Sequence, residues 1–327
     1  MNSFVRAQRN AFVSHIVDRA HDRRGDAPWM AQSLDDDRTR FVVVWQDQIL
    51  MDGDAPPRLS KLTSSKVAEL QAQCPDAGTD FIFLGIIDGT VYYGVGIGDP
   101  CDTLCSEGRC VGHFLDLRGA ALLLDPEEGA LAAQAKAMVY WHRHHALCAR
   151  CGSTMVAEEA GYQLRCSNAA CGVVEFPRVD PAIIVLVTSG DCCLLGRQAQ
   201  WPKGRYSSIA GFVEPGESLE TAVSREVWEE TGITIRALHY HSSQPWPFPQ
   251  SLMIGFTAEA ASETVTLNDA ELEDARWFTR QSLRQGLEDG RLGLPSPYSI
   301  SFHLIEDWFD EGDCGKLSDI LQSGPSR

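Results

Sequence analysis

Short apolar runs separated by polar and turn-forming residues dominate the first 147 residues of the chain. Runs of this length, rich in Val, Ile, Phe and Tyr, are typical of strands. Between two of them stands Asp88-Gly89-Thr90, a sequence that favours a tight hairpin. The runs that we expect to form strands lie at 41–45, 81–87, 91–95, 113–117 and 121–124. The pattern predicts a β-rich N-terminal domain over residues 1–147.

A helix is predicted near the end of this domain. Asp125 can cap a helix, Pro126 suits its first position, and Glu127 and Glu128 favour its positive end. The residues that follow, 131–145, are rich in alanine and place apolar side chains on one side. We therefore expect a helix that leads into the next part of the chain.

Strands and a helix alternate from residue 177 to the end. The run at 182–187 is apolar throughout, as in a strand that is buried on both faces. A helical stripe of apolar residues begins after Ser218 and stops before Gly232. Further strands are expected at 191–197, 206–210, 233–240, 251–258 and 276–278. This mixture predicts an α/β sandwich with a mixed sheet over residues 177–327.

The helix expected after Ser218 has a charged face opposite its apolar stripe. The charged residues are Arg225, Glu226, Glu229 and Glu230. Glu226 and Glu230 would lie about one turn, roughly 6 Å, apart, where ionised carboxylates repel each other. A divalent cation such as Mg²⁺ or Mn²⁺ prefers oxygen ligands and would relieve this repulsion. A solvated acidic helix face is the alternative, but the offsets of Gly211, Glu217 and Arg225 favour a metal site.

Composition limits the class of protein. A formal net charge of −17 argues against broad electrostatic affinity for nucleic acid or anionic membranes. Apolar stretches fall short of the roughly 18 residues that a membrane span needs, so no membrane association is expected. The odd number of cysteines, 11, and the lack of a secretory apolar region indicate a reducing compartment. We expect a cytoplasmic protein, because Asp18 and Asp22 interrupt the basic N-terminal region that would otherwise suit a transit peptide.

Two cysteine pairs lie between the two predicted domains. They are Cys148 with Cys151 and Cys166 with Cys171. Two thiolate pairs on tight turns supply the tetrahedral site of a zinc ribbon, which we predict over residues 148–176. Four protein ligands leave the zinc no open position, so its role is expected to be structural. The second pair is wider than usual, with four intervening residues. Glu158 and Glu159 make a nucleic-acid-binding ribbon the weaker interpretation.

Two other groups of potential ligands have simpler explanations. Cys101, Cys105, Cys110 and His113 fit no familiar zinc spacing, and free thiols in a loop are the preferred interpretation. Histidines also gather at the end of the helix predicted over 131–145. Partial positive charge is favoured at a helix C-terminus, so a polar helix end explains them better than a metal does.

The stretch 243–251, Ser-Gln-Pro-Trp-Pro-Phe-Pro-Gln-Ser, combines three prolines with two large aromatic residues. Prolines fix φ and remove donors, so this segment is stiff and is not expected in a central strand. Trp246 and Phe248 would suit stacking on flat heterocycles, with Gln244, Gln250 and Ser251 available for hydrogen bonds. A surface loop whose aromatic rings pack on the domain is an equally good interpretation of the composition.

The residues of the acidic helix and its flanks match a known pattern at every fixed position. They are Gly211, Glu217, Arg225, Glu226, Glu229, Glu230 and Gly232, and the pattern is the Nudix box G-x5-E-x7-R-E-x-x-E-E-x-G. The chain resembles the Nudix hydrolases, which act on nucleoside diphosphates linked to another moiety and depend on Mg²⁺ or Mn²⁺. This resemblance strengthens the metal-site interpretation of the helix.

The stretch 243–251 narrows the resemblance. Ser-Gln-Pro-Trp-Pro-Phe-Pro-x-Ser after a Nudix box resembles the signature of the NADH pyrophosphatase subfamily. The cysteine ribbon and the sequences Phe83-Leu84-Gly85 and Phe176-Pro177-Arg178 are similar to further subfamily landmarks, so the likeness covers nearly the whole chain. It implies a homodimer that cleaves NAD(H) to NMN(H) and AMP. It also implies removal of NAD caps from RNA 5′ ends.

The resemblance also implies roles for individual residues. Ligands of the catalytic metal would be the Ala210 carbonyl, Glu226, Glu230 and Glu271, with Glu229 joining the metal network or activating water. The substrate wall would comprise Gln244, Pro245, Trp246, Pro247, Phe248, Pro249, Gln250 and Ser251. Ser301 would lie near the dinucleotide. Phe176 stands where the family often has Tyr, so a stacking ring is kept and a hydroxyl contact is lost.

Two competing functions remain open from the sequence. A broader Nudix hydrolase would cleave ADP-ribose or other nucleoside diphosphate derivatives at the same site. A non-catalytic zinc-ribbon protein would use the Nudix domain only to sense nucleotides. The complete box favours an enzyme, and comparison of substrates would distinguish the two enzymatic alternatives.

Overall fold

The computed structural model describes residues 2–53, 56–73, 81–98, 112–268 and 271–323. The chain divides into two compact units. The C-terminal unit comprises Met1–Ala11, Asp180–Pro245 and Ser251–Arg327, and the N-terminal unit comprises Phe12–Val179 and Trp246–Gln250. Each unit therefore contains one short segment from a distant part of the sequence. No helix in the described ranges is long and apolar enough to cross a membrane.

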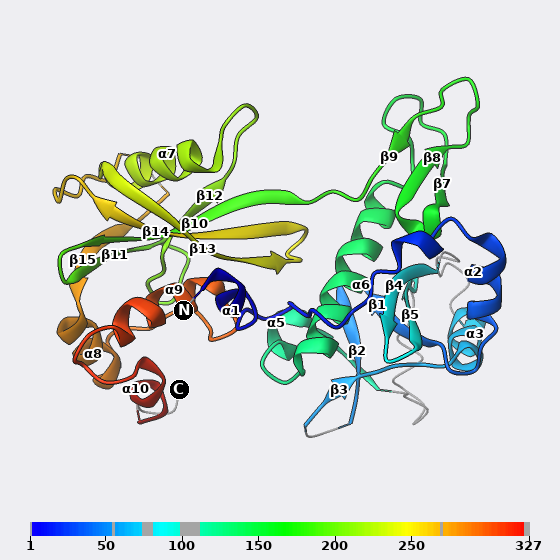
Figure 1. Cartoon of the computed structure of the whole chain (residues 1–327), viewed down its shortest axis with the longest axis horizontal. Helices are drawn as coiled ribbons and strands as arrows, with labels where there is room; N and C mark the ends of the chain where they lie inside the picture. Colours follow the sequence, from blue (N-terminus) through cyan, green and yellow to red (C-terminus); the bar gives the residue numbers. More distant parts are fainter. Residues whose placement is uncertain (1, 54–55, 74–80, 99–111, 269–270, 324–327) are drawn as a thin grey trace. The chain divides into compact units, whose positions relative to one another are not determined.

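A mixed six-stranded sheet forms the centre of the C-terminal unit (Figure 1). Its strands run in the order β13-β14-β10-β11-β15, and β12 also pairs with β10. The pairing of β10 with β14 is parallel, whereas β10 pairs antiparallel with β11 and β12. The strands are β10 (Asp180–Ser189), β11 (Cys192–Arg197), β12 (Ile209–Phe212), β13 (Ile235–Trp246), β14 (Ser251–Ala260) and β15 (Asp274–Thr279).

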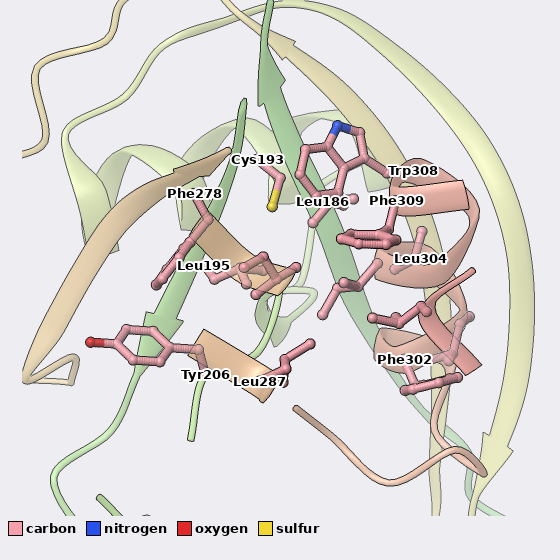
Figure 2. Packing of buried hydrophobic residues seen from close by; sticks show 14 of the residues in the cluster. Leu186, Cys193, Leu195, Tyr206, Phe278, Leu287, Phe302, Leu304, Trp308 and Phe309 are labelled. Atoms are coloured by element: carbon pink, nitrogen blue, oxygen red, sulfur yellow. The ribbon is translucent and has the colours of Figure 1, made fainter. Parts of the chain in front are cut away.

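Helices cover both faces of this sheet. They are α7 (Leu219–Thr231), α8 (Arg280–Glu288), α9 (Ile300–Asp310) and α10 (Leu317–Ser323). The unit also contains the short helix α1 (Ser3–Ala7), which has no buried residue. Alternate side chains of β10 enter two separate cores: Ile183 packs with α7, and Leu186 packs with α8 to α10. Figure 2 shows the second core, where Leu186 lies near Trp308 and Phe309. The predicted α/β sandwich and the doubly buried strand at 182–187 are both confirmed.

The N-terminal unit has a second mixed sheet of six strands, in the order β3-β2-β1-β5-β4, with β6 paired to β2. The strands are β1 (Arg40–Trp45), β2 (Gln48–Asp52), β3 (Arg58–Leu59), β4 (Ile82–Ile87), β5 (Thr90–Gly96) and β6 (His113–Asp116). The hairpin expected at Asp88-Gly89 is confirmed, because β4 and β5 pair antiparallel and both turn residues have positive φ. The prediction of a β-rich domain is therefore confirmed.

Helices accompany this second sheet. They are α2 (Ala27–Leu34), α3 (Ser64–Gln73), α5 (Leu117–Ala120) and α6 (Pro126–His144). The predicted start of α6 is confirmed, because the Asp125 side chain accepts a hydrogen bond from the Glu128 amide at 2.8 Å. At the other end, His144 and His145 bond the carbonyls of the preceding turn, as a polar helix end should. The strand expected at 121–124 is wrong: these residues continue from α5 as a turn.

Three short strands form a separate small sheet in the N-terminal unit: β7 (Met155–Glu158), β8 (Gln163–Cys166) and β9 (Val174–Glu175). They pair antiparallel in sequence order. The first cysteine pair precedes β7, whereas Cys166 ends β8 and Cys171 lies between β8 and β9. This is the arrangement of a ribbon whose turns carry the metal ligands.

Candidate functional site

Helix α7 has both of its ends defined locally. Ser218 is the N-cap, and its Oγ accepts a hydrogen bond from the Thr221 amide at 3.2 Å. Gly232 ends the helix in the left-handed region at φ 69°, which favours glycine. Val223 and Val227 are fully buried against the sheet. These contacts fix the rotation of the helix and therefore the direction of its acidic face.

The acidic face of α7 lies against Gly211, a residue of the preceding strand β12. A Cβ placed on Gly211 would lie 2.0 Å from Cδ of Glu226, so only glycine leaves room for this carboxylate. Glu226 is 8% exposed and Glu230 only 3%. Ala210, the residue before Gly211, pairs with Ile184 in the sheet. The buried Glu226 carboxylate thus lies beside a backbone segment that is paired with β10.

Arg225 connects the carboxylates of the box. Its Nε and Nη2 donate to the two carboxylate oxygens of Glu217 at 2.7 and 2.9 Å. Its Nη1 donates to Glu226 and Glu229, each at 2.9 Å. Nη2 also donates to the Phe212 carbonyl at 2.9 Å. The guanidinium therefore ties the loop before α7 to two successive turns of the helix.

The carboxylates differ in their electrostatic surroundings. Hydrogen bonds from Arg225 lower the pKa of Glu217 to about 2. Burial instead raises the pKa of Glu226, even though Arg225 acts in the opposite direction. The charges of Glu229 and Glu271 raise it further, so Glu271 lies near enough to repel Glu226. Glu271 also accepts a hydrogen bond from Gln198 at 3.3 Å. A cation near Glu226 would favour the ionised carboxylate and so lower the pKa of Glu226.

These groups fit a hard divalent cation by their chemistry. Carboxylate and carbonyl oxygens are the ligands that Mg²⁺ and Mn²⁺ prefer. Glu226 and Glu230 are both buried, and buried carboxylates are retained where they are paired or bind a metal. Within the described ranges, only the four ribbon cysteines bring three or more candidate ligand atoms all within 4.8 Å of one another. The box carboxylates are more widely spread, because Arg225 holds two of them at its guanidinium.

The four ribbon cysteines converge on one point. Sγ of Cys148 lies 3.8 Å from that of Cys171, and Sγ of Cys151 lies 3.4 Å from that of Cys166. All four sulfur atoms lie within 4.8 Å of one another. Zinc–sulfur bonds of about 2.3 Å at tetrahedral angles place sulfur atoms about 3.8 Å apart. The cluster therefore fits a four-coordinate zinc ion.

The wider second cysteine pair keeps its ligands in place through a closed turn. The Asn168 side chain accepts a hydrogen bond from the Ala170 amide at 3.0 Å. The Asn168 carbonyl accepts from the amides of Cys171 and Gly172 at 2.9 and 3.1 Å. Gly172 has a φ of 62°, which suits the sharp turn after the ligand. The additional residues therefore fold into the turn and leave Cys171 beside the other three ligands.

The Pro-aromatic stretch is divided between the two units. Gln244 belongs to the C-terminal unit and is fully buried. Its Nε2 donates to the carbonyls of Tyr298 at 2.6 Å and Ala11 at 3.2 Å. Its Oε1 accepts from the Ile300 amide at 2.8 Å. The amide of this side chain is thus engaged by the backbone of the unit, and its geometry is that of a positioning residue.

Residues Trp246–Gln250 belong to the N-terminal unit. The rings of Trp246 and Phe248 meet edge to face at 5.0 Å, and Phe12 lies 6.1 Å from Phe248. Two cations also face the Phe248 ring: the Arg118 guanidinium at 4.1 Å and the Lys136 ammonium at 5.5 Å from its centroid. These two cations could not be predicted from the sequence, because they are distant from the motif along the chain.

Comparison with known proteins places these features in one family. The NUDIX domain model matches residues 177–295, the NADH pyrophosphatase zinc ribbon model matches 143–176, and the model of an NADH pyrophosphatase-like rudimentary NUDIX domain matches 38–141. The NAD-capped RNA hydrolase NUDT12 of Macaca fascicularis is 34% identical over 339 residues, which cover 91% of this chain and 73% of that protein. The chain belongs to the NADH pyrophosphatase branch of the Nudix family.

Two other relatives of this Nudix protein come from a bacterium and a plant. The NAD-capped RNA hydrolase NudC of Mycobacterium bovis is 42% identical over 204 residues, covering 59% of this chain and 64% of that protein. Nudix hydrolase 19, chloroplastic, of Arabidopsis thaliana is 34% identical over 285 residues, covering 70% of this chain and 64% of that protein. Similarity therefore extends over relatives from three kingdoms.

The remaining residues expected at the site of this Nudix protein lie in different surroundings. Ser301 is buried, and its Oγ lies 2.9 Å from Ser207 Oγ and accepts from the Ser208 amide at 3.1 Å. Phe176 is 67% exposed. Ser251 begins β14 and is buried. Ser301 thus anchors the chain just before β12, whereas the Phe176 ring is open to solvent.

The N-terminal segment belongs to the C-terminal unit, which could not be predicted from the sequence. Asn10 is buried, and its Nδ2 donates to Ser242 Oγ at 3.1 Å and the Ser243 carbonyl at 3.0 Å. Arg9 forms ion pairs with Glu306 and Asp307 of α9. These contacts connect the first residues to the strand end that precedes the Pro-aromatic stretch. Cys101, Cys105 and Cys110 lie outside the described residues.

Proposed function

We propose that this Nudix protein hydrolyses the pyrophosphate bond of NADH and NAD⁺, giving NMN(H) and AMP. We extend the proposal to NAD caps at RNA 5′ ends, because relatives similar over most of the chain are NAD-capped RNA hydrolases. The observation that carries it is the complete box on α7, with Glu226 seated over Gly211 and oriented by Arg225. A degenerate box would instead have favoured a sensing role.

The chemistry requires positioning and charge neutralisation more than a protein nucleophile. When bound, Mg²⁺ or Mn²⁺ would neutralise charge on the phosphate oxygens and would lower the pKa of a water molecule. The residues that would hold the cation are Glu226, Glu230, Glu271 and the Ala210 carbonyl. Arg225 orients Glu226 from one side, and Gly211 leaves the room that this carboxylate occupies. Glu229, the more exposed partner of Arg225, is the proposed acceptor of the proton from the attacking water.

Recognition of the dinucleotide is proposed to use the Pro-aromatic stretch. Trp246 and Phe248 present large aromatic surfaces, and stacking on a flat heterocycle is the interaction they suit. Gln244 acts indirectly, because its amide bonds the backbone at three points. The prolines between these residues limit the backbone freedom that binding would otherwise have to remove. Gln250, Ser251, Ser301 and Phe176 complete the proposed substrate wall.

The proposal is tested by comparing substrates. Purified protein is incubated with NADH, NAD⁺, ADP-ribose and NAD-capped RNA, with Mg²⁺ or Mn²⁺, and products are separated by chromatography. We expect NMN(H) and AMP, and a higher kcat/KM for dinucleotides than for ADP-ribose. Equal kcat/KM for all of them would favour the broader Nudix hydrolase. Absence of hydrolysis with every cation would favour the nucleotide-sensing protein.

A matched pair of variants on α7 tests the site itself. Glu230→Gln removes a buried box carboxylate and should lower kcat by about a hundredfold or more. Glu220→Gln changes an exposed acidic residue of the same helix and should leave kcat unchanged. Circular dichroism should be the same for both. Near-normal kcat in Glu230→Gln would remove this residue from the proposed cation site.

Two further properties are proposed, the first from the family resemblance and the second from the composition of the chain. We expect a homodimer, which light scattering coupled to gel filtration would detect as twice the chain mass. We expect a cytoplasmic location, which fractionation of the source cells with an antibody would test. A monomeric mass or recovery in another compartment would contradict the respective proposal.

A further inference from the structure

Lys136 is a buried cation on α6 whose surroundings need an explanation. The residue is 3% exposed, yet it makes no ion pair with any residue that the structure describes. Glu128, on the same helix and also buried, is fully compensated: Lys61 lies 2.7 Å away, and the Leu59 amide donates to it at 3.2 Å. Helix α6 thus carries one buried residue, Glu128, that forms an ion pair, and another, Lys136, that forms none with a described residue. A buried ammonium without a partner is costly, so it is normally retained for a ligand or a specific contact.

The contact that Lys136 does make is with an aromatic ring of the Pro-aromatic stretch. Its Nζ lies 5.5 Å from the centroid of Phe248, and the Arg118 guanidinium lies 4.1 Å from the same centroid. Cation–π attraction is weaker than the cost of removing an ammonium from water. Burial of Lys136 lowers its pKa, and the positive charge of Arg118 acts in the same direction. Two cations therefore face one ring, and neither forms an ion pair with a residue in the described ranges.

Acidic residues near this pair do not neutralise it at close range. Asp47 and Asp116 attract Lys136, but neither forms an ion pair with it. The Asp116 carboxylate accepts a hydrogen bond from the Arg118 amide at 2.8 Å as the N-cap of α5. That oxygen is already engaged by the backbone. An external anion is the group that would satisfy both cations at once.

We propose that Lys136 and Arg118 form an anion site beside Phe248 that binds a phosphate group of a nucleotide ligand. A lysine point charge next to an arginine fork suits phosphate oxygens, and a neighbouring aromatic surface suits a base. The identity of the nucleotide rests on the proposed function. The phosphate belongs either to the dinucleotide itself or to the first phosphodiester of a capped RNA, and the experiment separates these sources.

The test uses the full chain and measures binding without hydrolysis. A short 5′-monophosphorylated oligoribonucleotide labelled at its 3′ end is titrated by fluorescence anisotropy over a range of salt concentrations. NADH is titrated in parallel by its own fluorescence, with divalent cations omitted. Each neutralised phosphate contact contributes about 0.7 to the slope of log Kd against log salt for a single strand. The Lys136→Met, Arg118→Gln double variant should therefore lose about 1.4 from the slope if both residues contact RNA phosphates.

Matched variants separate an anion site from a role in holding Phe248. Lys136→Arg keeps the charge and should retain most of the slope. Lys66→Met removes an exposed lysine of α3 in the same unit and should change nothing. Weakened RNA binding with unchanged NADH binding assigns the phosphodiester, and about tenfold weaker NADH binding assigns the dinucleotide phosphates. Unchanged Kd and slope for both probes in the folded double variant would overturn the anion site, whether or not the chain hydrolyses NADH.

Discussion

The carboxylate of Glu226 occupies the space where Gly211 would carry a side chain, with 2.0 Å between Glu226 Cδ and the position of a Cβ. A Cβ at residue 211 could therefore be accommodated only if the Glu226 carboxylate moved. We predict that Gly211→Ala displaces Glu226 and lowers kcat by about a hundredfold, since a misplacement of about 1 Å has that effect on a reacting group. Steady-state hydrolysis of NADH measures it.

A control is needed for the added methyl group itself. Gly119→Ala adds a Cβ that meets no atom within 4 Å, and should leave kcat unchanged. The Tm of Gly211→Ala should remain close to that of the unchanged protein, because β12 and α7 keep their other contacts. Full activity in Gly211→Ala would mean that hydrolysis does not depend on the position of the Glu226 carboxylate beside this glycine.

Arg225 gives the second prediction. Its planar fork donates to both oxygens of Glu217 while its other nitrogen reaches Glu226 and Glu229. Lysine is a point charge and cannot make this set of bonds. We expect Arg225→Lys to lower kcat about tenfold to hundredfold. Arg236→Lys, at an exposed ion pair of β13, is the control, and an equal loss there would show a general rather than a local effect.

Gln244 gives the third prediction, which concerns stability. Its Nε2 donates to two carbonyls, so the carboxylate of Gln244→Glu would face both Tyr298 and Ala11 without a proton to donate. Each buried group left unsatisfied costs about 1–3 kcal/mol. We expect a lower free energy of unfolding in urea by that order, whereas Gln285→Glu, on an exposed face of α8, should have no such effect.

The box could be predicted from the sequence because its geometry is local. The cap at Ser218, the stop at Gly232 and the four-residue spacing of Glu226 and Glu230 together define one helix face. The continuous apolar run of β10 likewise identified a strand with helices on both sides. Signals of this kind depend on neighbours in the sequence, so one chain is enough to read them.

Contacts between distant parts of the chain could not be predicted in this way. Asn10 bonds Ser242, and Lys136 faces Phe248, yet no periodicity relates these positions. The run at 121–124 was also predicted wrongly. Its apolar residues indicated a strand, but these residues form a turn after α5. Short apolar runs do not by themselves distinguish a strand from other buried or exposed segments.

The zinc cluster gives the fourth prediction. Four sulfur atoms within 4.8 Å should bind zinc in an amount equimolar with the chain. Cys151→Ser and Cys171→Ser should both lose the metal and lower the Tm, because binding energy at a closed site contributes to folding. Cys192→Ser, which changes a cysteine of β11 in the C-terminal unit, should keep it. Atomic absorption and thermal unfolding measure both effects, and zinc retained in Cys171→Ser would contradict the proposed ligand set.

The fifth prediction concerns acid stability and depends on Asp307 of α9. Burial opposes its ionisation, but hydrogen bonds from His241 and Arg9, with the charge of Arg9, hold the pKa of Asp307 well below its usual value. A carboxylate with a lowered pKa stabilises the folded state above its unfolded pKa of about 3.9. That contribution is lost as the pH falls further towards the folded value. Burial lowers the pKa of His241, so its protonation in the unfolded state begins to destabilise the protein below about pH 6.5.

We therefore expect stability to decrease as the pH falls. Protonation of His241 in the unfolded state causes the first loss, and protonation of Asp307 causes the second below about pH 4. The Tm measured at intervals from neutral to acidic pH should show these two stages. Asp307→Asn should lower the Tm at neutral pH, because it removes the partner of Arg9 and His241, and should flatten the stage below about pH 4. Asp313→Asn, an exposed residue after the same helix, should follow the unchanged protein. An Asp307→Asn profile parallel to that of the unchanged protein would show that acid destabilisation arises elsewhere in the chain.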